Sequence, residues 1–512
     1  MKPFVVSAVL ALAMVSSAQN PRGDGGQRNR GGDTTPAAVP TTPGAIKPIV
    51  IEPVQSKHTI TVNGHPLAYT AYAGTLPIRN DDGEVEGQLF FVAYLKDGAD
   101  LATRPITFAY NGGPGSSSAW LHMGVFGPRR VALNDDGSMP KPPYKLVDNQ
   151  ETWLESTDVV MVDAMGTGYS RPASADLAKK FYGMQGDIQA YGEFVRAYLN
   201  KYSRNRSPIY IAGESYGGIR TAGLSGYLTE RGVGLTGAVI ISGVENFITL
   251  SNGRGNDVPF VGYLPSFTAT AWYHKKLSAR LQKDLPTTLA EAEKFAANEY
   301  TVALTAGTSL SAAEKTKVAK RLAELTGLSE TYVSRANLKV TPGMFFKELL
   351  RDEGKVTGRL DSRITGEDAT DTGAGAEFDP SDAAITPPYN MLVNDYLANE
   401  LGVRVDERYR LTNYGTGWDY GQGGRGYPDT SEQLRQALQK NGHMKVMFAC
   451  GYYDLACPYF AQKFTVNHMD LREDQLSRLS FQFYPAGHMV YIEKGSREKL
   501  KRDIDAFYAG NK

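Results

Sequence analysis

The stretch "YIAGESYGGIR", residues 210–220, places a serine between two glycines directly after a short apolar run. Its centre, Gly213-Glu214-Ser215-Tyr216-Gly217, has the pattern Gly-x-Ser-x-Gly. Between a strand and a helix this pattern forms a tight turn, in which the serine is strained and the flanking glycines relieve crowding. The helix behind the turn directs backbone N–H groups towards negative charge that develops at the serine. The stretch therefore predicts an α/β fold with Ser215 as a nucleophile.

Short apolar runs on both sides of this stretch are typical of strands that are covered on both faces. These runs are "PITFAY" (105–110), "DVVMVD" (158–163), "PIYIAG" (208–213), "GAVIISG" (237–243), "KVMFAC" (445–450) and "LSFQFYPAG" (479–487). Helical patterns at 183–200, behind Ser215 and at 496–508 alternate with them. The alternation predicts a mostly parallel central sheet flanked by helices. Further strands are expected at "HTITV" (58–62) and "QLFFVAYL" (88–95).

The alternation stops in the middle of the chain. Helical patterns at 287–304 and 311–327 replace it. We therefore expect an α/β core in two parts, residues 51–243 and 386–512, interrupted by a largely helical cap insertion over residues 244–385.

The first residues read as an export signal. Lys2 is followed by an apolar run from Phe4 to Val15 and by small residues up to Ala18. This pattern predicts a signal peptide at 1–18 and an exported protein, periplasmic or extracellular. Residues 19–50 are rich in Gly, Pro, Arg and Thr, which predicts a flexible leader.

Charge and cysteine content exclude several classes of function. The 512 residues contain 55 Lys plus Arg and 55 Asp plus Glu, so no basic excess points to nucleic acid. No His-Glu-x-x-His or Cys-x-x-Cys occurs, and we expect neither a metal nor a cofactor. Only Cys450 and Cys457 are present, too few for a disulfide-built scaffold. The sequence leaves open whether these two pair.

A serine nucleophile needs a histidine base and an acid, which in this architecture follow it in the order serine, acid, histidine. Three of the seven histidines follow the predicted insertion, and of these only His488, in "PAGHMVY", comes directly after a predicted strand. Asp454, in "CGYYDLACP", follows the strand at 445–450. Asp163 also ends a predicted strand, but it precedes the serine. Asp454 is therefore the expected acid and Asp163 the alternative.

The stretch "NGGPGSSS" (111–118) follows the strand predicted at 105–110. Glycines let backbone N–H groups approach a ligand closely. The loop can thus supply a second donor to an oxyanion, although a plain surface turn would have a similar composition.

Four stretches together resemble the serine carboxypeptidase family, which has the α/β-hydrolase fold. They are "NGGPGSSS", "GESYGG" (213–218), "GYYDLACP" (451–458) and "AGHMVY" (486–491). The segment "DAMGTGYS" (163–170) is also similar to a family segment. The predicted helical insertion occupies the family's usual place.

The resemblance implies a role for each matching residue in acyl transfer. Ser215 would attack the scissile carbonyl, His488 would take its proton and pass it to the leaving amine, and Asp454 would orient His488. The backbone N–H groups of Gly113 and Tyr216 would form the oxyanion hole.

The resemblance also implies a site for the substrate's terminal carboxylate. Asn111, Gly112 and Glu214 would hold this group, while Cys457 and Met489 match positions near the leaving-group pocket. Because two carboxyl groups in contact disfavour ionisation, Glu214 is expected to stay protonated, which favours activity in acid.

Three residues depart from the family's pattern. Ala109 stands where a Trp is usual, and Val125 where a Glu usually pairs with the glutamate of the turn. The implied carboxylate clamp is therefore thinner than usual. Ser116 replaces a cysteine, so a disulfide common in eukaryotic members is missing.

The function implied is an exported serine carboxypeptidase, a peptidase that acts on peptides with a free C-terminal carboxylate through an acyl-enzyme. An esterase or acyltransferase with the same triad is the alternative. A binding protein with a vestigial triad is the third possibility, and the presence of all three triad residues argues against it.

Overall fold

The computed structural model describes residues 47–414, 417–421 and 426–510. The predicted signal peptide, 1–18, and the predicted leader up to residue 46 lie outside these residues.

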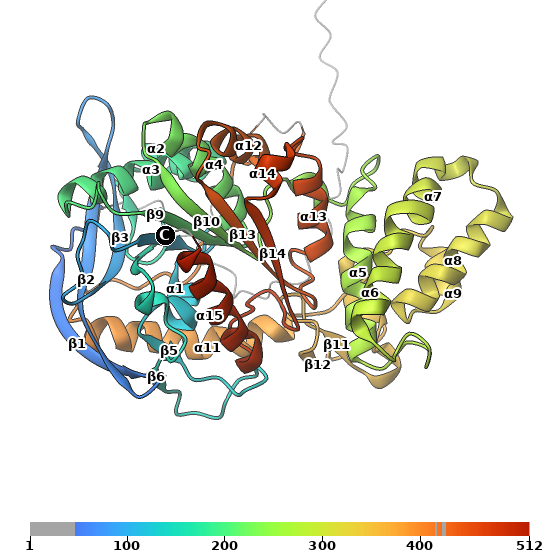
Figure 1. The fold of residues 1–512 in the computed structure, drawn as a ribbon. Coiled ribbons are helices and arrows are strands. Elements are labelled where there is room, and N and C mark those ends of the chain that lie inside the picture. The colour runs from blue at the N-terminus through green and yellow to red at the C-terminus, as the bar shows by residue number, and fades with distance from the viewer. Residues whose placement is uncertain (1–46, 415–416, 422–425, 511–512) are drawn as a thin grey trace, which may run out of the picture.

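A ten-stranded sheet runs through the described part of the chain in the order β1-β2-β3-β7-β4-β9-β10-β13-β14, with β8 paired to β3 (Figure 1). Its parallel strands are β4 (Ile106–Tyr110), β7 (Asp158–Val162), β9 (Ile209–Glu214), β10 (Leu235–Ile241), β13 (Lys445–Gly451) and β14 (Leu479–Tyr484). The antiparallel strands are β1 (Val54–Val62), β2 (His65–Arg79), β3 (Val85–Lys96) and β8 (Arg171–Pro172). The expected mostly parallel sheet is confirmed.

Helices cover both faces of the sheet, and alternate strand residues point to different cores. Phe108 of β4 and Phe448 of β13 pack towards α3 (Met184–Lys201), α4 (Gly217–Glu230) and α12 (Ser431–Lys440). Ala109 and Ala449, one residue further on, pack towards the other face. That face is covered by α1 (Ala119–Leu121), α11 (Pro380–Asp395) and α15 (Lys494–Ala509). This double cover explains why the parallel strands are continuous apolar runs.

A helical insertion follows β10 and has a hydrophobic core of its own, which includes Phe267, Leu322 and Phe345. It contains α5 (Val258–Tyr273), α6 (Leu285–Phe295), α7 (Thr301–Ala306), α8 (Ala312–Thr326), α9 (Glu330–Arg335) and α10 (Pro342–Glu348). Helix α5 packs against α13 (Tyr459–Asn467), and Figure 1 shows the bundle beside that helix. The helical insertion is confirmed, while its bounds, 244–385, and those of the two core parts stay a prediction.

Shorter elements complete the described chain. They are α2 (Ala175–Phe181), α14 (Glu473–Leu476), the hairpin β5 (Arg129–Val131) with β6 (Leu146–Asp148), and the hairpin β11 (Val356–Thr357) with β12 (Thr365–Gly366). The π-helical turns are η1 (His122–Phe126), η4 (Ala296–Tyr300) and η7 (Tyr396–Glu400). The 3-10 turns are η2 (Trp153–Glu155), η3 (Phe247–Thr249), η5 (Gly307–Ser309) and η6 (Arg351–Glu353). Within the described ranges, none of the helices has both the length and the apolar character needed to cross a membrane.

Strand order decides where the polar loops meet. Strands β4, β7, β9, β13 and β14 run parallel, so the residues that follow them lie at one edge of the sheet. In open α/β sheets this carboxyl edge is where ligands bind.

Candidate active site

Ser215 lies in a sharp turn between β9 and α4. Its φ is +63°, in the left-handed region that costs energy for any residue with a side chain. The turn is held by two backbone hydrogen bonds: Ser215 N–H donates to Ile241 O (3.1 Å) and Gly218 N–H donates to Ser215 O (2.8 Å). A Cβ at Gly213 would lie 2.4 Å from Gly217 O, so a side chain is excluded there. Both features are those of a nucleophile turn.

The structure brings Asp454 and His488 together at the same edge. Nδ1 of His488 and Oδ2 of Asp454 are 2.8 Å apart, and both side chains are buried, 5% and 0% exposed. The other oxygen of Asp454, Oδ1, accepts from the N–H groups of Ala456 (2.7 Å) and Cys457 (2.9 Å). Asp454 is therefore held rigidly by its own loop, with one oxygen left for the imidazole.

Asp163, the alternative acid, has a different partner. Its Oδ1 accepts from the backbone N–H (2.8 Å) and the hydroxyl (2.7 Å) of Ser118. Ser118 ends the "NGGPGSSS" stretch, so Asp163 fixes that loop in place. The geometry therefore pairs His488 with Asp454 and leaves Asp163 as a support of the loop after β4.

Electrostatics favour a basic His488. Burial alone would lower the pKa of the imidazole, but the charge of Asp454 and the hydrogen bond to it, with a further contribution from Glu214, raise it above the ordinary value. A histidine in this setting accepts a proton more readily than a free one.

A loop of the insertion ties the Asp454 and His488 loops together. Residues 358–364 join β11 to β12. Leu455 N–H donates to Arg359 O (3.1 Å), and His488 N–H donates to Leu360 O (2.6 Å). A Cβ at Gly487 would lie 2.4 Å from Leu360 O, so the histidine loop requires a glycine there. The role of this loop could not be predicted from the sequence, because its contacts are made by backbone carbonyls, which every residue has.

The glycines after β4 approach the Ser215 turn closely. A Cβ at Gly112 would lie 2.4 Å from the backbone nitrogen of Tyr216, and Gly113 has a φ of +103° that favours glycine. Tyr216 is the residue that precedes α4, and its N–H is one of the predicted oxyanion donors. The loop thus lies against the turn, as a second donor requires.

Asn111 and Glu214 are in direct contact. Asn111 Nδ2 donates to Glu214 Oε1 (2.8 Å), while Leu121 N–H donates to Asn111 Oδ1 (2.9 Å). Glu214 Oε2 has no hydrogen-bond partner among the described residues, nor does the Tyr491 hydroxyl, yet the two groups lie close enough to affect each other's pKa. Tyr491 was not predicted to belong to this cluster.

The position of Tyr491 also explains why residue 124, directly before Val125, is a glycine. A Cβ at Gly124 would lie 2.3 Å from the Tyr491 ring and 3.1 Å from the Tyr389 hydroxyl. Two tyrosines therefore crowd Gly124, the residue next to the position where the resemblance implied a second glutamate.

Burial raises the pKa of Glu214 to about 7, although the charge of His488 and contacts with Tyr491 and Asn111 lower it. The side chain is only 3% exposed. Glu214 is thus a neutral acid up to about neutral pH, and in this form its carboxyl group can donate a hydrogen bond.

A buried ion pair supports Asn111 from behind. Arg220 of α4 binds Asp187 of α3 (Nε to Oδ2, 2.6 Å), and its guanidinium also donates to Asn111 O. Both charged side chains are almost fully buried. This pair was missed because nothing in the sequence links residues 187 and 220 before the fold brings α3 and α4 together.

Cys457 and Met489 flank the same region. The Cys457 thiol interacts with the Ser215 hydroxyl, and burial raises its pKa well above the ordinary value. Cys450 and Cys457 are both free and buried, which answers the question that the sequence left open. Met489 is buried in the sheet core, and its role at the leaving group stays a prediction.

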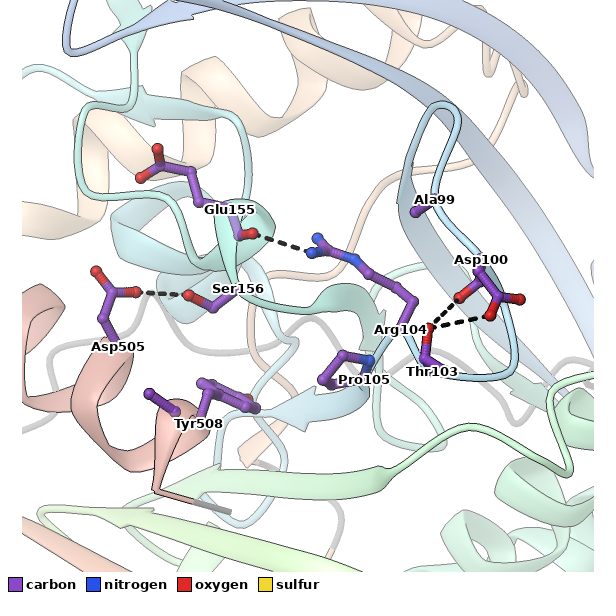
Figure 2. Close-up of a pocket in the computed structure, with 10 residues that line it drawn as sticks. Ala99, Asp100, Thr103, Arg104, Pro105, Glu155, Ser156, Asp505 and Tyr508 are labelled. Carbon is purple, nitrogen blue, oxygen red and sulfur yellow. Dashed lines mark hydrogen bonds between the residues drawn. The ribbon is translucent and has the colours of Figure 1, made fainter. Parts of the chain in front are cut away.

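A hollow of about 390 Å³ lies at the opposite end of the parallel strands (Figure 2). It is lined by residues such as Pro105, which precedes β4, and Ser156, which precedes β7. Its polar groups are satisfied locally, for example Ser156 Oγ by Asp505 Oδ1 (2.6 Å). The hollow therefore has no part in chemistry at Ser215.

Sheet order and nucleophile turn are those of an α/β hydrolase. The chain belongs to the serine carboxypeptidase family, since the family model described as "Serine carboxypeptidase" matches residues 63–482. The matched range contains Ser215 and Asp454 and ends shortly before His488.

Three curated relatives illustrate the similarity. The chain is 30% identical over 159 residues to "Pheromone-processing carboxypeptidase KEX1" of Saccharomyces cerevisiae, over 29% of this chain and 21% of that protein. It is 27% identical over 157 residues to "Serine carboxypeptidase-like 5" of Arabidopsis thaliana (29% and 34%). It is 27% identical over 215 residues to "Serine carboxypeptidase S10 family member 1" of Dictyostelium discoideum (40% and 45%). The alignments thus span less than half of each relative.

Proposed function

We propose that the protein is a serine carboxypeptidase, a hydrolase that removes the C-terminal residue of a peptide through an acyl-enzyme. The observation that carries the proposal is the 2.8 Å contact between His488 Nδ1 and Asp454 Oδ2 at the sheet edge that holds the Ser215 turn. Membership of the serine carboxypeptidase family supports the choice of reaction.

Acylation begins when Ser215 Oγ attacks the scissile carbonyl carbon and Nε2 of His488 takes the hydroxyl proton. Asp454 stabilises the imidazolium through Nδ1. The carbonyl oxygen becomes an oxyanion, which receives hydrogen bonds from the N–H groups of Gly113 and Tyr216. The carbon–nitrogen bond then breaks, the amine leaves with the proton from His488, and the acyl group stays on Ser215.

Deacylation repeats these steps with water. His488 takes a proton from the water, whose oxygen attacks the acyl carbon, and the second oxyanion uses the same donors. Collapse breaks the ester bond, and His488 returns the proton to Ser215 Oγ. The shortened peptide leaves as a carboxylic acid.

Asn111, Gly112 and Glu214 bind the terminal carboxylate of the substrate. Asn111 is fixed by Arg220 and Leu121, and Gly112 packs directly against the backbone of Glu214 and Tyr216. A protonated Glu214 donates a hydrogen bond, whereas an ionised Glu214 would repel the substrate. Substrate binding should therefore weaken as pH rises through the Glu214 pKa of about 7.

Export is part of the proposal. The pattern of residues 1–18 supports a cleaved signal peptide and a periplasmic or extracellular site of action.

The test compares N-blocked dipeptides with the same peptides amidated at the C-terminus. A carboxypeptidase should cleave the free acids far faster, and Ser215→Ala should abolish the cleavage. Equal cleavage of acids and amides, or hydrolysis of esters alone, would replace the proposal with an esterase or acyltransferase that uses the same triad.

A further inference from the structure

Arg359 combines a fixed backbone with an open side chain. Its carbonyl oxygen accepts from Leu455 N–H, one residue after Asp454, and its neighbour Leu360 accepts from His488 N–H. The side chain, however, is 51% exposed. The backbone of Arg359 is therefore fixed between the loops that carry Asp454 and His488, while its positively charged side chain is exposed to solvent.

The backbone of Arg359 lies against the loop that carries Cys457, because its carbonyl oxygen accepts from Leu455 N–H (3.1 Å), two residues before Cys457. The charge of the Arg359 side chain acts on Cys457, on Tyr263 and on His488. The Cys457 thiol in turn interacts with the Ser215 hydroxyl. Arg359 is thus within electrostatic reach of the reacting groups, although it is separate from the Asn111 and Glu214 cluster.

The ion pair that Arg359 makes within the protein is weak. Its Nε lies 3.8 Å from Asp379 Oδ2, and that oxygen has no hydrogen-bond partner among the described residues. Asp379 uses its other oxygen for the backbone N–H groups of Arg359 and Ser381 (both 3.0 Å). At this distance, and with the arginine half exposed, the ion pair contributes little. The guanidinium fork therefore keeps donors for a carboxylate from outside, a group whose geometry it matches.

The proposed function indicates which carboxylate of the substrate could bind Arg359. The terminal carboxylate of the substrate is assigned to Asn111 and Glu214. A second anion on the same side of the scissile bond is the side chain of an acidic C-terminal residue. We propose that Arg359 binds this side-chain carboxylate, so that the protein cleaves peptides ending in glutamate faster than peptides ending in glutamine. This proposal rests on the proposed carboxypeptidase activity.

The test uses two N-blocked dipeptides that differ only in a C-terminal Glu or Gln. The ratio of kcat/KM for Glu to kcat/KM for Gln is measured on one enzyme at one pH, so an effect of Arg359 on His488 cancels. We expect a ratio of about tenfold, the low end of what a charge-assisted hydrogen bond supplies. Arg359→Gln should bring the ratio to about one, since no charged donor remains. Arg359→Glu should make the enzyme prefer a C-terminal Lys over Gln.

Arg335→Gln is the matched control, because Arg335 is an exposed arginine of α9 in the same insertion. It should keep the wild-type ratio. A wild-type ratio at or below one, or a preference that survives in Arg359→Gln, would overturn the role of Arg359 while peptide cleavage continued. Failure of the wild-type protein to cleave either peptide would overturn the proposed function, and this inference with it.

Discussion

Replacing Glu214 with glutamine should remove a destabilisation that depends on pH. Glu214 has a pKa of about 7 in the folded protein against an ordinary value of 4.5, mainly because of burial. Below pH 4.5 the Glu214 carboxyl is protonated in both the folded and the unfolded state, so it does not lower the free energy of unfolding. As pH rises towards 7 the unfolded state ionises while the folded state keeps its proton, so stability falls. The loss of stability is complete once the pH exceeds the pKa that Glu214 has in the folded protein.

The magnitude follows from the two pKa values. At about 1.36 kcal/mol per pKa unit, the difference between 4.5 and about 7 amounts to about 3 kcal/mol. Glutamine is neutral at every pH, and its carbonyl oxygen can still accept from Asn111 Nδ2. Compared with the wild type, Glu214→Gln should therefore gain about 3 kcal/mol of unfolding free energy between pH 4.5 and pH 8.

Urea unfolding of both proteins at several pH values measures this gain. A difference between the two proteins that stays constant from pH 4.5 to pH 8 would refute the reasoning. The KM for a peptide with a free C-terminus gives a second readout: it should rise through about pH 7 in the wild type and stay level in Glu214→Gln.

Glu245→Gln is the matched control. Burial also raises the pKa of Glu245 to about 7, and its Oε1 accepts from Gln462 Nε2 (3.0 Å). This variant should show a similar gain in stability but keep the wild-type rise in KM, because Glu245 has no place in the carboxylate cluster. A level KM in Glu245→Gln would contradict the role assigned to Glu214.

Two further substitutions test the loop after β4 and the tyrosine beside Glu214. Gly112→Ala would place a Cβ 2.4 Å from Tyr216 N and displace the oxyanion donors, so kcat should fall about 10²-fold or more, and a kcat within threefold of wild type would contradict this. Tyr491→Phe removes a contact that lowers the pKa of Glu214, so the rise in KM should move to higher pH. If the rise in KM stays at the same pH or moves to lower pH, the contact between Tyr491 and Glu214 is contradicted.

The sequence predicted the parallel strands and the positions of Ser215, Asp454 and His488. Each parallel strand is covered on both faces, and such strands are recognisable as apolar runs such as residues 445–450. Ser215 was recognisable because a turn at φ +63° needs its flanking glycines. In both cases the structure restricts the residue types at a few adjacent positions, so a short stretch of sequence is enough to recognise it.

Other parts could not be predicted because their causes lie far apart in the chain. Strand β2 contains Gly74 and Pro77, and its buried and exposed residues do not alternate. Residue 74 has to be a glycine because a Cβ there would lie 2.6 Å from the Cα of Pro53. The 358–364 loop contacts His488 through a backbone carbonyl, which any residue possesses. Tyr491 meets Glu214 only after β9 and the chain beyond β14 reach the same edge of the sheet.

The most direct test of the account is labelling with a fluorophosphonate, followed by mass spectrometry of the modified peptide. The wild-type protein should carry the label on Ser215, and Asp454→Asn should react slower by a factor on the order of 10³ to 10⁴, because the asparagine favours the wrong tautomer of His488. A label on another residue, or an Asp454→Asn protein that reacts as fast as the wild type, would contradict the account.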